Sequence, residues 1–158
     1  MSPTVPLQGA APTTGSPHEA SVNPPPGHSA PGEEYHVVIA RTQTTLATRA
    51  RIARSLPERL IGLLDRSHFA PGEALVILSC RSIHTCFMRF AIDAVFVDGT
   101  WGVVAIRASL PPWRLTPVMW GAQAVIELPA GTVEQAHVRL GDRLRLEPSA
   151  VRKPLDSA

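Results

Sequence analysis

Residues 80–99, CRSIHTCFMRFAIDAVFVDG, decide the fold of this chain. From position 86 to position 96 every even-numbered residue is apolar, whereas the odd-numbered positions include Arg89 and Asp93. A period of two is typical of a β-strand that has one face in the core. We therefore predict a central strand in this block. Arg89 and Asp93 are expected on its other face, and His84 lies just before it.

Further strands are predicted on both sides of this block. Runs of apolar or alternating residues with the length of a strand occur at 35–40, 44–52, 74–79, 124–128 and 143–147. Asp98-Gly99 is a tight-turn signal, so residues 95–105 are predicted to form a hairpin. A second hairpin is predicted across residues 41–43.

The predicted strand at residues 44–52 alternates clearly. Arg49 and Arg51 occupy one side, and the opposite side is expected to carry Leu46, Thr48, Ala50 and Ile52. The arginines are interpreted as the solvated face of the strand rather than as a phosphate or nucleic-acid patch, because no aromatic residue is interleaved with them for stacking on bases.

Helical signals are few. Ser55, Pro57 and Glu58 form a helix-start signature, and leucines recur at helical spacing after it, which predicts one short helix near residues 55–66. Residues 132–135 are predicted to form a single helical turn. Six to eight short strands with one short helix indicate a mainly β (β-rich α+β) class and a compact single domain, either barrel-like or a sandwich.

Composition divides the chain into three parts. Residues 1–32 hold 8 of the 16 prolines and no Lys or Arg, so they are predicted to be a disordered Pro-rich tail. Residues 33–148 form the single β-rich domain, and residues 149–158 are expected to be a loose C-terminal tail. The tail has no apolar core of a signal peptide and no run is long enough for a membrane helix, so a soluble, cytoplasmic protein is expected.

Charge and cysteine content bound the chemistry. The formal net charge of +2 is too small to indicate nucleic acid as a partner. Cys80 and Cys86 would lie about 20 Å apart on an extended strand, so two reduced thiols are expected. Neither C-x-x-C nor H-x-x-x-H is present, so no metal and no cofactor are predicted.

Three motifs resemble those of one known family. They are Arg59-Leu-Ile-Gly-Leu-Leu-Asp-Arg66, the block from Ile83 to Gly99 with its Met-basic-x-x-Ile-Asp pattern, and Val125-Ile-Glu-Leu-Pro-Ala-Gly131 followed by Gly141-Asp142. In this order they are similar to the motifs of the domain of unknown function 192 (DUF192) family. One departure is visible, because the family usually has Pro where this chain has Ala91.

The resemblance implies a small bacterial or archaeal protein with a compact, largely β fold and no established biochemical activity. It also assigns motif positions that we expect to be structural: Arg59, Gly62, Met88, Gly131, Gly141 and Asp142.

The charged positions inside the predicted strands allow two interpretations that remain open. Arg59 or Arg89 could pair with Asp93 or Glu127 in an internal ion-pair network. Alternatively, a polar pocket for an anionic or polyhydroxyl ligand could be lined by His84, Arg89, Asp93 and Glu127, with Trp113 and Arg114 over it.

The preferred functional hypothesis is a noncatalytic β-domain that binds a small polar ligand or a protein partner, because no complete catalytic constellation is present. The alternative is a hydrolase-like enzyme in which His84 acts as a general base oriented by Asp93 or Glu127. That alternative requires His84 to lie within hydrogen-bonding reach of one of these carboxylates.

Overall fold

A single curled sheet dominates the computed structural model, which describes residues 33–53 and 67–149. Its strands and helix in chain order are β1 (Tyr35–Ile39), β2 (Thr44–Ala53), β3 (Glu73–Leu78), β4 (Ile92–Val97), β5 (Val103–Leu110), β6 (Ala124–Pro129), α2 (Thr132–Gln135) and β7 (Leu144–Pro148). The mainly β class and the predicted number of strands are confirmed. The helix predicted near residues 55–66, with Arg59 and Gly62, lies outside the described residues.

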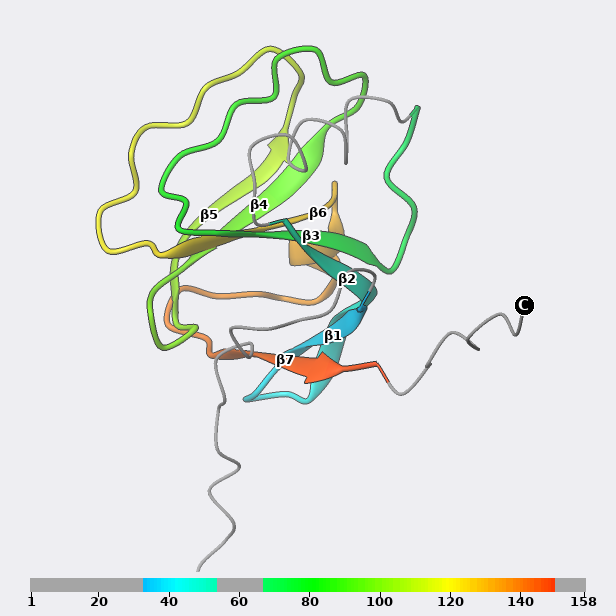
Figure 1. Cartoon of the computed structure of the whole chain (residues 1–158), viewed down its shortest axis with the longest axis vertical. Coiled ribbons are helices and arrows are strands. Elements are labelled where there is room, and N and C mark those ends of the chain that lie inside the picture. Colours follow the sequence, from blue (N-terminus) through cyan, green and yellow to red (C-terminus); the bar gives the residue numbers. More distant parts are fainter. Residues whose placement is uncertain (1–32, 54–66, 150–158) are drawn as a thin grey trace, which may run out of the picture.

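The strand order is β5-β4-β6-β3-β2-β1-β7. Every neighbouring pair is antiparallel except β2 and β3, which run parallel. At one end the two edge strands approach each other, because Gly102 and Arg143 form an isolated bridge and the Val103 N–H donates to the Asp142 carbonyl at 2.8 Å. The sheet is therefore a half-barrel, as Figure 1 shows, which is the barrel-like form of the prediction.

Both hairpins predicted from sequence are present. Gln43 N–H donates to the Ile39 carbonyl at 2.8 Å in the turn between β1 and β2. In the turn between β4 and β5, one oxygen of Asp98 accepts hydrogen bonds from the N–H groups of Thr100 and Gly102 at 2.8 and 2.9 Å. The single helical turn predicted at residues 132–135 is α2.

Two clusters of buried apolar side chains pack against opposite faces of the sheet. The larger one fills the concave side and includes Val95, Ile126, Leu128 and Val133. The smaller one lies between the other face and the long loops, and it includes Leu75, Phe96 and Met119. Because both faces of the sheet are covered here, every residue of β4 is buried.

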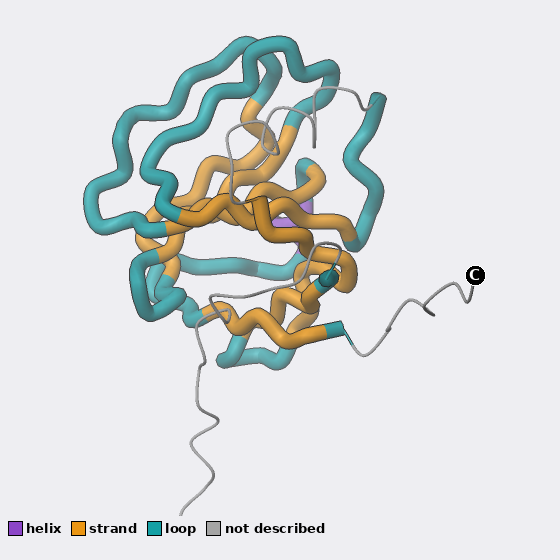
Figure 2. Tube along the Cα trace, viewed as in Figure 1, coloured by secondary structure: helices purple, strands orange, loops and turns teal. Residues whose placement is uncertain are grey.

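The prediction of a strand from position 86 onward is wrong. β4 begins only at Ile92, and residues 80–91 form an irregular loop that runs beside a second loop at residues 111–123 (Figure 2). Met88 is buried in the smaller core cluster, while Phe87 has φ of 67° and points outward. The apolar alternation arose because residues of this loop pack onto the sheet from outside, not because they extend the strand.

The face assignment within β2 is also corrected. Thr48 was expected on the apolar side but is exposed, whereas Ala47 is buried. Tyr35 pairs with Ala50 and Val37 pairs with Ala47, so three steps along β2 oppose two steps along β1. This extra residue is a β-bulge, and a bulge moves the following side chains to the other face of the strand.

Candidate functional site

Asp93 lies in the interior rather than on an outer face. It is fully buried, and its two carboxylate oxygens accept hydrogen bonds from the backbone N–H groups of Ser109, at 2.7 Å, and Val133, at 2.8 Å. One carboxylate therefore joins β4 to the end of β5 and to α2. Among the described residues it forms no ion pair with Arg89, so it satisfies backbone donors instead of a neighbouring side-chain charge.

Glu127 is buried too, but it points to the opposite face of the sheet. It lies opposite Ala94 in β4 and Leu75 in β3, whereas Asp93 lies opposite Leu128. Residues paired directly across antiparallel strands share a face, and consecutive residues alternate. The predicted pocket that would use both carboxylates together is therefore not formed by this sheet.

The other predicted residues lie on the two long loops. His84, Arg89, Trp113 and Arg114 are all exposed. His84 forms an isolated bridge with Leu115, and the Trp113 N–H donates to the Thr85 carbonyl at 3.0 Å. The structure thus places His84, Trp113 and Arg114 on one pair of loops, whereas Asp93 lies within the sheet.

The hydrolase-like pairing is not assembled in the described part of the chain. His84 forms no hydrogen bond there with either Asp93 or Glu127, and both oxygens of Asp93 are already engaged by backbone donors. A general base needs an orienting partner within hydrogen-bonding reach.

Cys80 and Cys86 are free thiols, and no three His, Cys, Asp or Glu side chains of residues 33–53 and 67–149 gather as a metal site would require.

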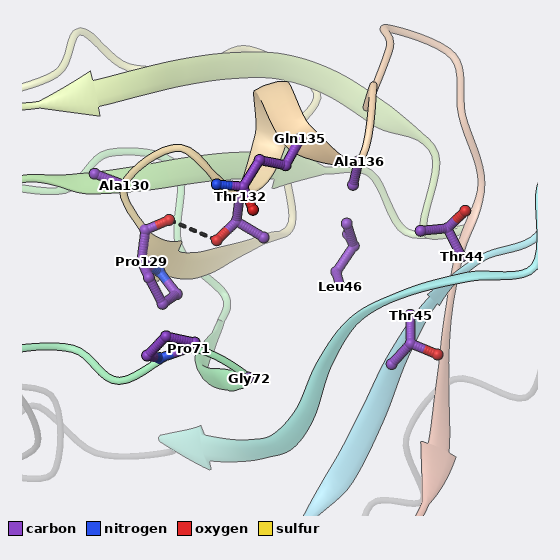
Figure 3. A pocket seen from close by; sticks show the side chains of 10 residues that line it. All are labelled: Thr44, Thr45, Leu46, Pro71, Gly72, Pro129, Ala130, Thr132, Gln135 and Ala136. Carbon is purple, nitrogen blue, oxygen red and sulfur yellow. Dashed lines mark hydrogen bonds between the residues drawn. The ribbon is translucent and has the colours of Figure 1, made fainter.

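A cavity of about 320 Å³ lies elsewhere, between the start of β2, the turn before β3 and the segment from Pro129 to α2 (Figure 3). Its polar lining consists of Thr44, Thr45, Thr132 and Gln135. Leu46, Pro71 and Pro129 contribute apolar surface. Among the described residues no charged side chain lines it, which distinguishes it chemically from the arginine-rich loops.

The local structure explains how the cavity keeps its shape. The Thr132 hydroxyl donates to the Pro129 carbonyl at 2.7 Å, which ties α2 to the end of β6. Gly131 precedes the helix with φ of 89°, a conformation that favours glycine. The side chains of Thr45 and Gln135 form no hydrogen bond with other described residues, so their polar atoms are available to a ligand.

The sequence did not point to this cavity, because its three segments are distant along the chain. A partial signal was present in the Val125–Gly131 motif, whose final residues form one wall. Gly131, the last residue of this motif, lies directly before Thr132 of the lining.

Asp142, another motif residue, closes a contact between distant turns. It accepts hydrogen bonds from the Arg41 guanidinium at 2.8 Å and from the Arg139 N–H at 2.9 Å. The Arg41 hydrogen bond is the largest cause that lowers the pKa of Asp142, and it outweighs the burial that acts in the opposite direction. The pKa of Arg41 is raised by the same hydrogen bond.

Comparison with known sequences confirms the family resemblance that the motifs indicate. The model of the DUF192 family, described as Uncharacterized ACR, matches residues 37–146. A UPF0127 protein of Pyrococcus furiosus is 35% identical over 100 residues, which cover 60% of this chain and 83% of that protein. A UPF0127 protein of Thermococcus sibiricus is 33% identical over 126 residues, which cover 77% of this chain and 81% of that protein.

Two crystal structures share the fold. One is a putative transcription regulator from Sinorhizobium meliloti 1021, with a TM-score of 0.63 and 22% identity over 72% of this chain and 92% of that chain. The other is a protein of unknown function from Novosphingobium aromaticivorans DSM 12444, with a TM-score of 0.63 and 22% identity over 83% of this chain and 99% of that chain. At this identity the likeness concerns the fold alone.

Proposed function

The chain belongs to the DUF192 family, which has no established activity, and we propose that it is a noncatalytic domain that binds a small, uncharged polyhydroxyl ligand. The observation that carries this proposal is the cavity of about 320 Å³, in which the described lining residues offer hydroxyl and amide groups and no charged side chain. Ligand pockets begin at roughly 300 Å³, so the cavity suits a molecule of about one ring.

The chemistry of the lining favours this class of ligand. Threonine hydroxyls and the Gln135 amide both donate and accept hydrogen bonds, as the hydroxyls of a sugar or polyol also do. Leu46, Pro71 and Pro129 offer apolar surface for the C–H groups of a ring. The described lining residues offer an anionic ligand no cationic partner in exchange for its lost hydration, so anions are disfavoured.

The test is a calorimetric binding screen of the full chain against neutral monosaccharides and polyols, with organic anions and nucleotides for comparison. We expect saturable binding of a neutral compound and a loss of about tenfold in affinity in Gln135→Leu, which corresponds to removal of one or two hydrogen bonds. Gln123→Leu is the matched control, because Gln123 is exposed and does not line the cavity.

Two outcomes would overturn the proposal. One is a preference for anions that is unaffected by Gln135→Leu. The other is a screen in which no neutral compound binds, and that result would favour the protein-partner form of the original hypothesis.

A further inference from the structure

The two long loops carry a group of exposed apolar side chains that the cavity does not use. We define the loop surface by Phe87, Trp113, Leu115, Val118 and Trp120. Trp120 is 83% exposed, Leu115 is 75% exposed and Phe87 is 67% exposed. Large side chains exposed this far and close together are unusual, and such patches mark interaction sites.

Contacts between the loops make this surface continuous. The rings of Phe87 and Trp113 meet edge to face with centroids 4.7 Å apart. Leu115 lies two residues beyond Trp113 and bridges to His84 on the neighbouring loop. Further along, the Met119 N–H donates to the Arg81 carbonyl at 2.7 Å, which holds the segment with Val118 and Trp120 against the same loop.

The backbone conformation of Phe87 and Trp113 indicates that the surrounding structure enforces the outward position of their rings. Phe87 has φ of 67° and Trp113 has φ of 61°. Bulky residues rarely adopt this left-handed region, and conformations of this kind persist where the surrounding structure enforces them, often at functional positions. Two aromatic residues that touch each other share it here, and both rings remain at the surface.

The surface is also positively charged. Residues 80–92 and 99–126 contain four arginines and no Asp or Glu. The exposed Arg114 lies between Trp113 and Leu115, and the Arg107 guanidinium lies 3.9 Å from Met119 Sδ. Arg81 and Arg89 are exposed on the other loop. Charge complementarity therefore favours an anionic partner.

We propose that the loop surface docks on an anionic phospholipid bilayer. Trp, Phe and Leu beside Arg are the residues that insert at the interface between headgroups and acyl chains. Nucleic acid would use the arginines and the aromatic rings, but the aliphatic Leu115 and Val118 neither stack on bases nor bond to phosphate. The docking that we propose is peripheral, through the two loops. Among the described residues no helix is long and apolar enough to cross a membrane.

The backbone of the loops fits shallow insertion. The N–H groups of Thr85, Trp113, Arg114, Thr116 and Met119 all donate to acceptors on the paired loop. Backbone donors that reach the hydrocarbon must already have partners, because hydrocarbon offers no acceptor. A protein strand that added itself by backbone pairing would find these same groups occupied.

The test is sedimentation of the full chain with vesicles of phosphatidylcholine alone and vesicles containing about one third phosphatidylglycerol. We expect binding to the anionic vesicles, a decrease with salt, and a blue shift of tryptophan fluorescence. Leu115→Ser should weaken partitioning by about tenfold, from the lost apolar burial. Arg114→Gln should weaken it by about fivefold, from the loss of one cation.

Matched variants separate the loop surface from a general effect. Leu140→Ser removes a leucine of similar exposure, 67%, that lies outside the two loops, and Arg51→Gln removes an exposed arginine of β2. Neither should change partitioning. Equal losses in Leu140→Ser and Leu115→Ser would overturn the proposal.

Other occupants of the loop surface give distinct results. Absence of binding to the anionic vesicles, together with binding of a single-stranded oligonucleotide or of polyglutamate that Arg114→Gln weakens, would assign the surface to nucleic acid or to an acidic protein and overturn the proposal. Self-association that Leu115→Ser abolishes, without vesicle binding, would overturn it in favour of a second copy.

Discussion

Asp93 shows how a charged residue in an apolar strand acts as a structural acceptor. Its carboxylate satisfies two backbone donors from separate elements, so Asp93→Asn should lower the free energy of unfolding by about 2–3 kcal/mol, because the amide replaces one acceptor oxygen with a donor. Asp93→Ala should cost more, since both N–H groups then lose their partner. Urea unfolding measures both, and wild-type stability of Asp93→Asn would contradict this role.

Asp142 should make stability depend on pH. Its folded pKa is lowered, and the pKa of an unfolded Asp is about 3.9. The folded state therefore binds fewer protons than the unfolded state in this range, so the stabilisation is present above about pH 4 and is lost as the pH falls through the folded pKa. Burial acts to raise the pKa of Asp98, but the hydrogen bonds that its carboxylate accepts from Gly102 and Thr100 together lower it, so Asp98 adds to this acid sensitivity.

The measurement is the difference in Tm between the wild type and Asp142→Asn. This difference should be constant between pH 7 and about pH 5 and should shrink below about pH 4. Glu134→Gln is the control, because Glu134 is an exposed carboxylate of α2 that forms no side-chain hydrogen bond with the described residues. A difference that grows on acidification would contradict the assignment.

At the scale of elements, the loop pair is joined by two buried threonines. The Thr85 hydroxyl donates to the Pro111 carbonyl at 2.7 Å and accepts from the Arg114 N–H at 2.9 Å. The Thr116 hydroxyl accepts from the Ile83 N–H at 3.0 Å. These side chains attach each loop to the other and so help to fix the position of the loop surface.

Thr85→Val keeps the shape of the side chain but removes both of these hydrogen bonds. We expect a loss of about 1–3 kcal/mol in the free energy of unfolding, together with faster amide hydrogen exchange at Trp113 and Arg114. The protection of the β6 amides should fall only by as much as the free energy of global unfolding falls. Unchanged exchange in the loops of Thr85→Val would show that the backbone hydrogen bonds alone hold them.

The elements differ in how far local sequence predicts them. The β4–β5 hairpin was predictable because Asp98 and Gly99 mark a turn between two apolar runs, and the Asp98 carboxylate closes that turn by accepting from the N–H groups of Thr100 and Gly102. The loop at residues 80–91 was not, because its apolar residues face a part of the sheet that forms from distant segments. Apolar residues alternate both in the loop at residues 80–91 and in the strand that follows it. Only packing against distant segments distinguishes an extended strand from a loop that covers a strand.

The same limit applied to the candidate site. His84, Trp113 and Arg114, which were proposed for one pocket, lie on two paired loops. Placing Asp93 and Glu127 beside them failed, because strand parity puts these two carboxylates on opposite faces once the register is known. The cavity combines segments that no local pattern connects.

For the whole molecule, the sheet from β1 to β7 spans Tyr35–Pro148. We propose, as composition indicates, that residues 1–32 form a separate tail, so their deletion should change the Tm by less than about 1 °C. Differential scanning calorimetry of the full chain and the shortened chain provides the comparison. A decrease of several degrees would mean that the tail contributes to the folded domain.

The pairing of β1 with β7 has a consequence for synthesis on the ribosome. Arg41, in the turn after β1, bonds to Asp142 from a position 101 residues earlier in the chain. At roughly 5–20 residues per second, the first strand leaves the ribosome many seconds before its last partner is made. During this interval one edge of β1 has no neighbouring strand, so nascent chains stalled before residue 144 should be substrates for chaperones.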